Sequence, residues 1–247
     1  KTVLVQPLIA EIKEEFDEIF FFSTTSKLLK NDYQFIPEEN KYDHVNLDKI
    51  EEIIKEQERI IEYNHTVSKG EQIKSRVCLL FDDCIADNNS RSKIVDGLYT
   101  RGRHIHISVF FLSQMYKNTE SGGFKKTARM NCDILISFVQ PNEDDRKAFV
   151  KENLSTLDSK EGMRIFNLIT SFKYCAIVIN RHLISSARTY QEYVQFIKID
   201  ADKKVRKFMI EPPKMEKLKT VKPKKVDVEK QSFTGYGTTI KRELRTF

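Results

Sequence analysis

Residues 77–83 read Val77-Cys-Leu-Leu-Phe-Asp82-Asp83, a short apolar run that ends in two carboxylates. A run with no polar interruption is typical of a strand that is buried on both faces of a sheet. Four similar runs lie along the chain, at residues 18–23, 105–112, 133–139 and 174–179. Helical patterns occur between and beside them, at residues 47–63, 90–102, 124–130, 142–152 and 160–170. This alternation predicts βαβ units and an α/β fold with a mainly parallel sheet.

The remaining segments give weaker patterns. Residues 2–16 have apolar side chains at helical intervals, although Pro7 would break or kink a helix there. Asn46 is a plausible N-cap for the helix predicted at residues 47–63. We expect residues 24–45 to form a loop, and a terminal pair of strands around residues 193–199.

Asp82 and Asp83 lie at the carboxyl end of a predicted strand, where parallel sheets bind their ligands. A P-loop ATPase needs one carboxylate at this position to hold Mg²⁺, usually through water. A second, adjacent carboxylate can orient or deprotonate the attacking water. The alternative is structural, because Asp often begins the turn that follows a strand.

Polar residues near the next strand extend this pattern. Gln114 follows the run at residues 105–112, and its amide could contact a γ-phosphate or the attacking water. Arg103 precedes that run, and Arg129 precedes the run at residues 133–139. Either arginine could neutralise charge on a transferred phosphoryl group, including across a subunit interface. Alternatively, Gln114 opens a loop and the arginines are ordinary surface residues.

The succession of these motifs resembles a known family. Strand, Asp-Asp, helix, Thr-Arg-Gly-Arg-His, strand, Ser-Gln and then Arg-Met-Asn before another strand is similar to the packaging ATPases of poxviruses and other large nucleocytoplasmic DNA viruses. These proteins belong to the FtsK/HerA class of P-loop NTPases. The resemblance runs from residue 1 to about residue 180 and is densest over residues 77–140. It implies a three-layer P-loop NTPase fold.

The resemblance also implies roles for single residues. Asp82 would be the Walker B carboxylate associated with Mg²⁺, and Asp83 the catalytic carboxylate. Gln114 would be the polar sensor of the next strand. Arg129 or Arg103 would be offered to the nucleotide of a neighbouring subunit, and the sequence does not choose between them.

One element of the family pattern is missing from the chain. A P-loop wraps phosphates with glycine N–H groups followed by Lys and Ser or Thr, but the first glycine here is Gly70. The chain opens Lys1-Thr2 before a helical pattern and a strand, which is the context that follows a glycine-rich loop in this family. We therefore expect a truncated P-loop, with Lys1 contacting the β- and γ-phosphates and Thr2 the Mg²⁺. The dipeptide could also match by chance.

Charge is distributed unevenly along the chain. The net charge of the whole is +6, whereas residues 203–247 carry 14 Lys or Arg against 5 Asp or Glu, a net charge of +9. Residues 1–202 are therefore slightly acidic. We expect an ATPase domain over residues 1–200 and a basic arm over residues 201–247, which would bind a polyanion. The alternative is a solvated tail that aids solubility.

Together these features favour an ATP- and Mg²⁺-dependent translocase that moves double-stranded DNA, without reading its sequence, into a viral capsid. Motors of this class imply a homo-oligomeric ring and a capsid or portal-vertex partner. One alternative is a degenerate P-loop subunit that does not hydrolyse ATP. Another is a related cellular or plasmid translocase or helicase. A small-molecule P-loop kinase is a third, but it leaves the basic tail unexplained.

The sequence also bears on location. No apolar run approaches the roughly 18–20 residues that span a bilayer, and the N-terminal pattern is not that of a secretory signal. The four cysteines show neither Cys-x-x-Cys spacing nor a nearby pair of histidines, which argues against a zinc site or a disulfide framework. We expect a soluble, intracellular protein without a membrane span, located in the virus factory of the host cytoplasm or in the virion.

Overall fold

The computed structural model describes residues 2–25, 33–84, 87–117, 125–199 and 205–209. The chain divides into two compact units, Lys1–Cys132 and Asp133–Phe247. The boundary predicted near residue 200, between an ATPase domain and a basic arm, stays a prediction, because residues 210–247 lie outside the described ranges.

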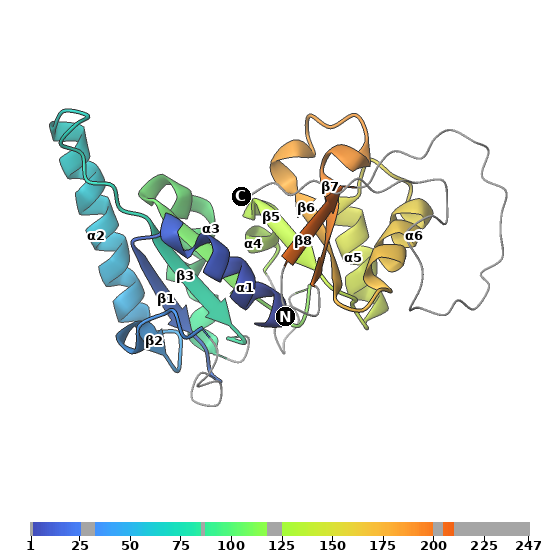
Figure 1. Ribbon diagram of the computed structural model, residues 1–247, viewed down its shortest axis with the longest axis horizontal. Helices are drawn as coiled ribbons and strands as arrows, with labels where there is room; N and C mark the ends of the chain where they lie inside the picture. The colour runs from blue at the N-terminus through green and yellow to red at the C-terminus, as the bar shows by residue number, and fades with distance from the viewer. Residues whose placement is uncertain (1, 26–32, 85–86, 118–124, 200–204, 210–247) are drawn as a thin grey trace. The chain divides into compact units, whose positions relative to one another are not determined.

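In the described part of the first unit, four strands form one sheet, and every pair of neighbours is parallel. The strands lie in the order β2-β1-β3-β4 (Figure 1). Their bounds are Glu18–Phe22 for β1, Lys41–Tyr42 for β2, Val77–Asp82 for β3 and Ile107–Leu112 for β4. The helices of this unit are α1 (Thr2–Ile12), α2 (Leu47–Thr66), α3 (Lys93–Arg101) and α4 (Lys126–Asn131). The predicted α/β fold with a parallel sheet is confirmed.

Both faces of this sheet are covered by helices, because side chains alternate along each strand. On one face, Leu79 of β3 packs into a core with Ile50 of α2 and Val95 of α3. On the other face, Leu80 packs into a core with Ile9 of α1. The result is a helix–sheet–helix arrangement, which explains why the strand sequence is apolar at every position except its last.

The predicted N-cap of α2 is confirmed, since the side-chain oxygen of Asn46 accepts a hydrogen bond from the backbone N–H of Lys49 at 3.0 Å. Pro7 was expected to break or kink the first helix, and it does not break it, because α1 continues through this residue. Proline removes one backbone donor from a helix. Ile9 is fully buried and Val5 packs against the same core, so tertiary packing stabilises the helix despite that loss.

Short 3-10 turns connect several elements. They are η1 (Lys13–Glu15), η3 (Glu38–Asn40), η4 (Asn88–Arg91), η5 (Gly102–Ile105), η6 (Arg181–Leu183) and η7 (Tyr190–Glu192). The stretch 24–45, expected as a loop, includes η3 and the short strand β2. Residues 26–32 of that stretch lie outside the described ranges.

The second unit has a sheet of a different kind. Its described strands are β5 (Ile134–Ser137), β6 (Cys175–Asn180), β7 (Val194–Ile199) and β8 (Val205–Met209), in the order β5-β6-β7-β8. Every pair of neighbours is antiparallel. The helices are α5 (Glu143–Asn153) and α6 (Ser159–Thr170).

This sheet corrects part of the sequence prediction. The strands expected at residues 133–139 and 174–179 exist, but they pair antiparallel with each other and do not extend the parallel sheet. The first five residues of β6 are all buried, so its apolar sequence looks like that of a parallel strand. Burial on both faces fixes the composition of a strand but not its direction. A terminal pair of strands was expected around residues 193–199; β7 lies there, and its antiparallel partner β8 follows at Val205–Met209.

Candidate functional site

The carboxyl ends of β1, β3 and β4 lie side by side in the first unit. Phe22 of β1 is in register with Phe81 of β3, and Asp82 of β3 is in register with Leu112 of β4. The residues that follow each strand therefore meet at one edge of the sheet. These are residues 23–25 after β1, residues 83–84 after β3 and residues 113–114 after β4.

Asp83 and Gln114 interact across this edge. The amide Nε2 of Gln114 donates a hydrogen bond to Oδ1 of Asp83 at 3.0 Å. The second carboxylate oxygen of Asp83 and the amide oxygen of Gln114 have no partner among the described residues. Asp83 is half-buried and Gln114 is exposed, so both side chains are accessible to water. Two hydrogen-bond acceptors thus lie together at the edge where parallel sheets bind ligands.

Asp82 has a different environment. It is the last residue of β3 and its exposed fraction is 4%. Alternation along the strand puts it on the same face as Leu80, which is the face covered by α1. Figure 1 shows α1 running against the direction of β3, so the helix begins, at Thr2, nearer the carboxyl edge. Lys1 lies outside the described residues.

This edge suits Mg²⁺ by its donor set. Mg²⁺ prefers oxygen ligands and is usually held by one or two carboxylates together with water and substrate phosphates. Asp82 and Asp83 supply carboxylates, and Ser23, Thr24 and Thr25 supply hydroxyls. Among the described residues, no three His, Cys, Asp or Glu side chains form a cage for a metal. The oxygen donors at this edge fit the chemistry of a Mg²⁺ ion that keeps water and phosphate ligands.

The two candidate arginines lie in different places. Arg129 of α4 is buried, with its guanidinium 4.9 Å from the centre of the Tyr116 ring and its Nη1 donating to the Tyr116 carbonyl at 3.4 Å. Arg103 is exposed in η5, which precedes β4 and therefore lies at the amino edge of the sheet. The structure brings Asp82, Asp83 and Gln114 together, but it does not bring Arg103 to them.

Further contacts tie α4 to α3. Lys125, which precedes α4, forms an ion pair with Asp96 of α3 at 2.6 Å and donates to the Arg91 carbonyl at 2.7 Å. The helix that carries Arg129 is therefore anchored within the first unit.

Sequence reasoning missed two residues that hold the turn after β3. The Thr24 hydroxyl donates to the Asp83 carbonyl at 3.0 Å, and the Cys84 thiol donates to the Phe22 carbonyl at 3.1 Å. Burial raises the pKa of Cys84 to about 12, so its thiol is a hydrogen-bond donor and not a ready nucleophile. The run Ser23-Thr24-Thr25 directly after an apolar strand was the available signal for Thr24.

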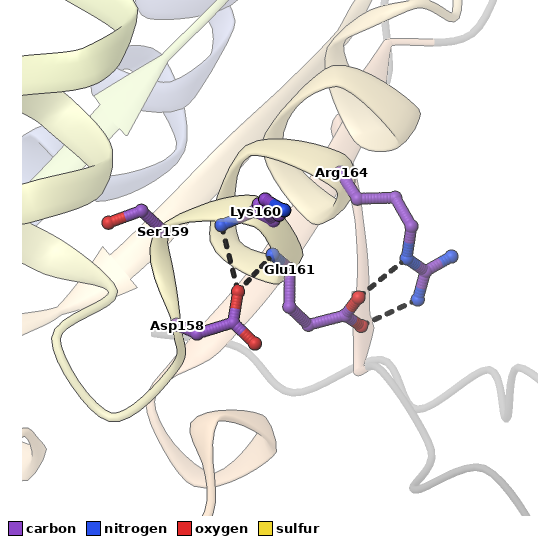
Figure 2. A pocket seen from close by; sticks show the side chains of 5 residues that line it. All are labelled: Asp158, Ser159, Lys160, Glu161 and Arg164. Atoms are coloured by element: carbon purple, nitrogen blue, oxygen red, sulfur yellow. Dashed lines mark hydrogen bonds and ion pairs between the residues drawn. The ribbon is translucent and has the colours of Figure 1, made fainter.

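A pocket in the second unit is a weaker candidate (Figure 2). Its volume is about 490 Å³, and it is lined by Asp158, Ser159, Lys160, Glu161 and Arg164. Asp158 already accepts from the first free backbone N–H groups of α6, at 2.8 and 2.9 Å. Glu161 and Arg164 form a two-pronged ion pair at 2.6 and 2.7 Å. The backbone N–H groups at the start of α6 and the Arg164 guanidinium are therefore already engaged with carboxylates, which leaves the Lys160 ammonium as the pocket's cation without such a partner among the described residues.

All four cysteines lie in the described ranges and are free thiols. Within those ranges, no helix combines the length and the apolar character that crossing a membrane requires.

Comparisons with known proteins identify the family. No curated protein and no solved structure matches the chain. The profile of the family described as "Poxvirus A32 protein" matches residues 1–211, a span that includes every described element of both units. The chain therefore belongs to the poxvirus A32 protein family, the packaging ATPases of poxviruses.

Proposed function

We propose that this protein is an Mg²⁺-dependent ATPase that translocates double-stranded DNA into a viral capsid. The observation that carries the proposal is the hydrogen bond between Gln114 and Asp83 across the ends of β4 and β3. It joins a carboxylate and an amide at the edge of a parallel sheet, beside the buried carboxylate of Asp82. Membership of a packaging ATPase family supports the same assignment.

The geometry suits activation of a water molecule. The second carboxylate oxygen of Asp83 and the amide oxygen of Gln114 are both acceptors. A water that donates one hydrogen to each keeps a lone pair directed away from them, toward a phosphate. Asp83 can then take the proton as the water attacks. Gln114 holds Asp83 in place through its Nε2 throughout.

The remaining residues would bind the nucleotide. Asp82 would hold Mg²⁺, through water, and Thr2 and Lys1 would contact the metal and the β- and γ-phosphates. Bound Mg²⁺ would neutralise charge on the phosphates as the terminal bond breaks. Arg129 or Arg103 would complete the site of a neighbouring subunit in a homo-oligomeric ring.

The basic arm supports DNA as the substrate. Residues 203–247 carry a net charge of +9, and Lys and Arg bind phosphates without reading bases. We infer sequence-independent contact with double-stranded DNA, a capsid or portal-vertex partner, and action in the virus factory or the virion. Family membership favours this viral role over that of a cellular or plasmid translocase.

The competing function is a P-loop subunit that binds DNA without hydrolysing ATP. The hydrogen bond between Asp83 and Gln114 would have no catalytic role in such a subunit.

The decisive experiment measures ATP hydrolysis with and without double-stranded DNA, using the protein together with any residues that precede Lys1 in its gene. Asp83→Asn should lower kcat by about 10²–10⁴-fold, the usual contribution of a general base. Nucleotide binding should be retained, because Asn preserves the shape of the side chain. Glu62→Gln is the matched control, since Glu62 is an exposed acid on α2. A folded wild-type protein without any hydrolysis would leave the non-hydrolysing subunit as the better account.

A further inference from the structure

The turn that carries Asp83 is attached to the end of the neighbouring strand β1 at two points. Thr24 donates its hydroxyl to the Asp83 carbonyl at 3.0 Å, and Cys84 donates its thiol to the Phe22 carbonyl at 3.1 Å. In the first bond a residue after β1 donates to the turn, and in the second a residue of the turn donates to β1. The first bond is exposed and the second is buried.

Asp83 has an unusual backbone conformation. Its φ angle is 55°, in the left-handed region that residues other than glycine seldom adopt, although Asp tolerates it better than most. Residues in this region persist where their surroundings hold them there, and they are frequent at functional sites. Asp83 is also the residue whose carboxylate accepts from Gln114. Its backbone conformation and its side-chain contact therefore belong to one arrangement.

We propose that Thr24 is a positioning residue that keeps Asp83 in this conformation, so that its carboxylate faces Gln114 and the attacking water. The inference rests on the proposed function, in which Asp83 is the catalytic base. Thr24, Asp83 and Gln114 form a hydrogen-bonded chain across the ends of β1, β3 and β4. Because the parallel strands have a fixed spacing, these hydrogen bonds hold the Asp83 carboxylate in a fixed position.

The turn that carries Thr24 is itself well defined. The Ser23 side chain is fully buried, and its Oγ accepts from the Thr25 backbone N–H at 3.3 Å. The same Oγ lies 3.1 Å from the Thr25 hydroxyl. The Ser23 backbone N–H donates to the Tyr42 carbonyl of β2 at 3.0 Å. Thr24 is thus presented by a turn that is fixed on both sides, as a positioning residue must be.

The hydrogen bonds of Thr24 and Cys84 should differ in effect, one on the position of Asp83 and the other on the stability of the fold. Cys84 is buried, and loss of its hydrogen bond would leave a buried carbonyl without that donor, which is costly to folding. Thr24 is exposed, so water can replace its hydroxyl at the Asp83 carbonyl. Water restores the hydrogen bond but not the fixed position of the donor. Loss of the Thr24 hydroxyl should therefore affect catalysis more than folding.

Steady-state ATP hydrolysis by the full-length protein tests this inference with two variants. Thr24→Val keeps the shape of the side chain but removes the donor, and it should lower kcat by roughly three- to tenfold with KM and Tm close to wild type. Thr24→Ser restores the hydroxyl and should restore most of kcat. Cys84→Ala should show the reverse pattern, with a lower Tm and a smaller effect on kcat. Equal kcat values for wild type and Thr24→Val, or a Thr24→Ser variant as slow as Thr24→Val, would overturn the role of Thr24.

A crystal structure of Thr24→Val tests the position of Asp83 without a measurement of ATP hydrolysis. The φ angle of Asp83 should move away from 55°, and the distance from Gln114 Nε2 to Asp83 Oδ1 should lengthen beyond 3.0 Å. An unchanged turn would exclude positioning by Thr24. If the wild-type protein does not hydrolyse ATP, the proposed function fails, and this structural comparison alone decides whether Thr24 positions Asp83.

Discussion

The two units are built from similar apolar strands, yet they place their polar residues differently. In the parallel sheet, residues after β1, β3 and β4 all lie at one edge, because parallel neighbours end together. In the antiparallel sheet, Asn180 at the end of β6 pairs with Ile134 at the beginning of β5. Neighbouring strand ends there point to opposite edges. The residues that follow the strands therefore gather at one edge of the first sheet, whereas in the second sheet they are divided between two edges.

The charged groups of the two units show the same contrast. At the first sheet's edge, Asp83 and Gln114 keep acceptors that no described residue engages. In the pocket of the second unit, Asp158 caps its own helix and Glu161 is paired with Arg164 (Figure 2). The first arrangement leaves two acceptors available to a substrate, whereas in the second Asp158, Glu161 and Arg164 stabilise the first turns of a helix. The difference predicts that catalytic sensitivity is confined to the first unit.

The largest expected effects are on folding, and they test whether the two units are separately cooperative. Phe81 of β3 and Phe166 of α6 are both fully buried. Replacing either by Ala should lower the free energy of unfolding by about 3–5 kcal/mol, through lost burial and the cavity left behind. Hydrogen exchange should show lost protection in β1, β3 and β4 for Phe81→Ala, and in β6, α5 and α6 for Phe166→Ala. Equal loss across both units in each variant would show a single cooperative structure.

The next effect concerns one carboxylate from each unit. Asp82→Asn should lower kcat for Mg²⁺-dependent ATP hydrolysis by about 100-fold or more, because the metal loses its carboxylate. Glu161→Gln should leave kcat unchanged, because it removes a surface ion pair with Arg164 that contributes little to stability. The measurement is the initial rate of hydrolysis over a range of Mg²⁺ concentrations. An Asp82→Asn variant that is as active as Glu161→Gln would remove the metal role from this edge.

A smaller effect is expected at two glutamines that follow strands. Gln114 comes after β4, and Gln140 comes after β5, where its Nε2 donates to the Ser137 hydroxyl at 3.2 Å. Gln114→Met should lower kcat by roughly 10- to 100-fold, because a hydrogen bond to an ionised carboxylate is worth about 1.5–3 kcal/mol. Gln140→Met should retain the wild-type kcat. Activity that depended equally on both glutamines would contradict the difference between the two sheets.

Much of the candidate site could be predicted from sequence because it depends on local patterns. The run at residues 77–82 correctly predicted the bounds of β3. The carboxylates of Asp82 and Asp83 were correctly expected at the end of that strand. The meeting of Asp83 with Gln114 follows once β3 and β4 are parallel neighbours.

Other features depend on information that the patterns do not contain. The parallel direction predicted for β5 and β6 was wrong, because a buried strand has the same composition in a parallel sheet and in an antiparallel one. The contact of Thr24 with Asp83 needs the register of β1 against β3 and a left-handed residue at position 83. Asp is compatible with that conformation but does not require it. The expectation that Pro7 would break or kink α1 considered the lost hydrogen bond and not the burial of Ile9, which stabilises an unbroken helix.

The smallest effect is a dependence of stability on alkaline pH. Burial raises the pKa of Cys84 from 9.0 to about 12 in the folded protein. As pH rises above 9, the thiol of the unfolded chain loses its proton first, so the unfolded state binds fewer protons and stability falls. The contribution is fully present below pH 9 and is lost as pH approaches 12. Cys84→Ser keeps a hydroxyl donor for the Phe22 carbonyl and should remove this part of the pH dependence.

For Cys84 the expected loss is about 1 kcal/mol on going from pH 8 to pH 10. Urea denaturation followed by circular dichroism measures it, since the chain has no tryptophan. Cys78 shares the raised pKa of about 12, and burial also raises the pKa of Cys175, so a residual dependence should remain in Cys84→Ser and become smaller when Cys78 is replaced as well. Identical pH profiles for wild type and Cys84→Ser would mean that water reaches the Cys84 thiol, and that the hydrogen bond from Cys84 to the Phe22 carbonyl is open in solution.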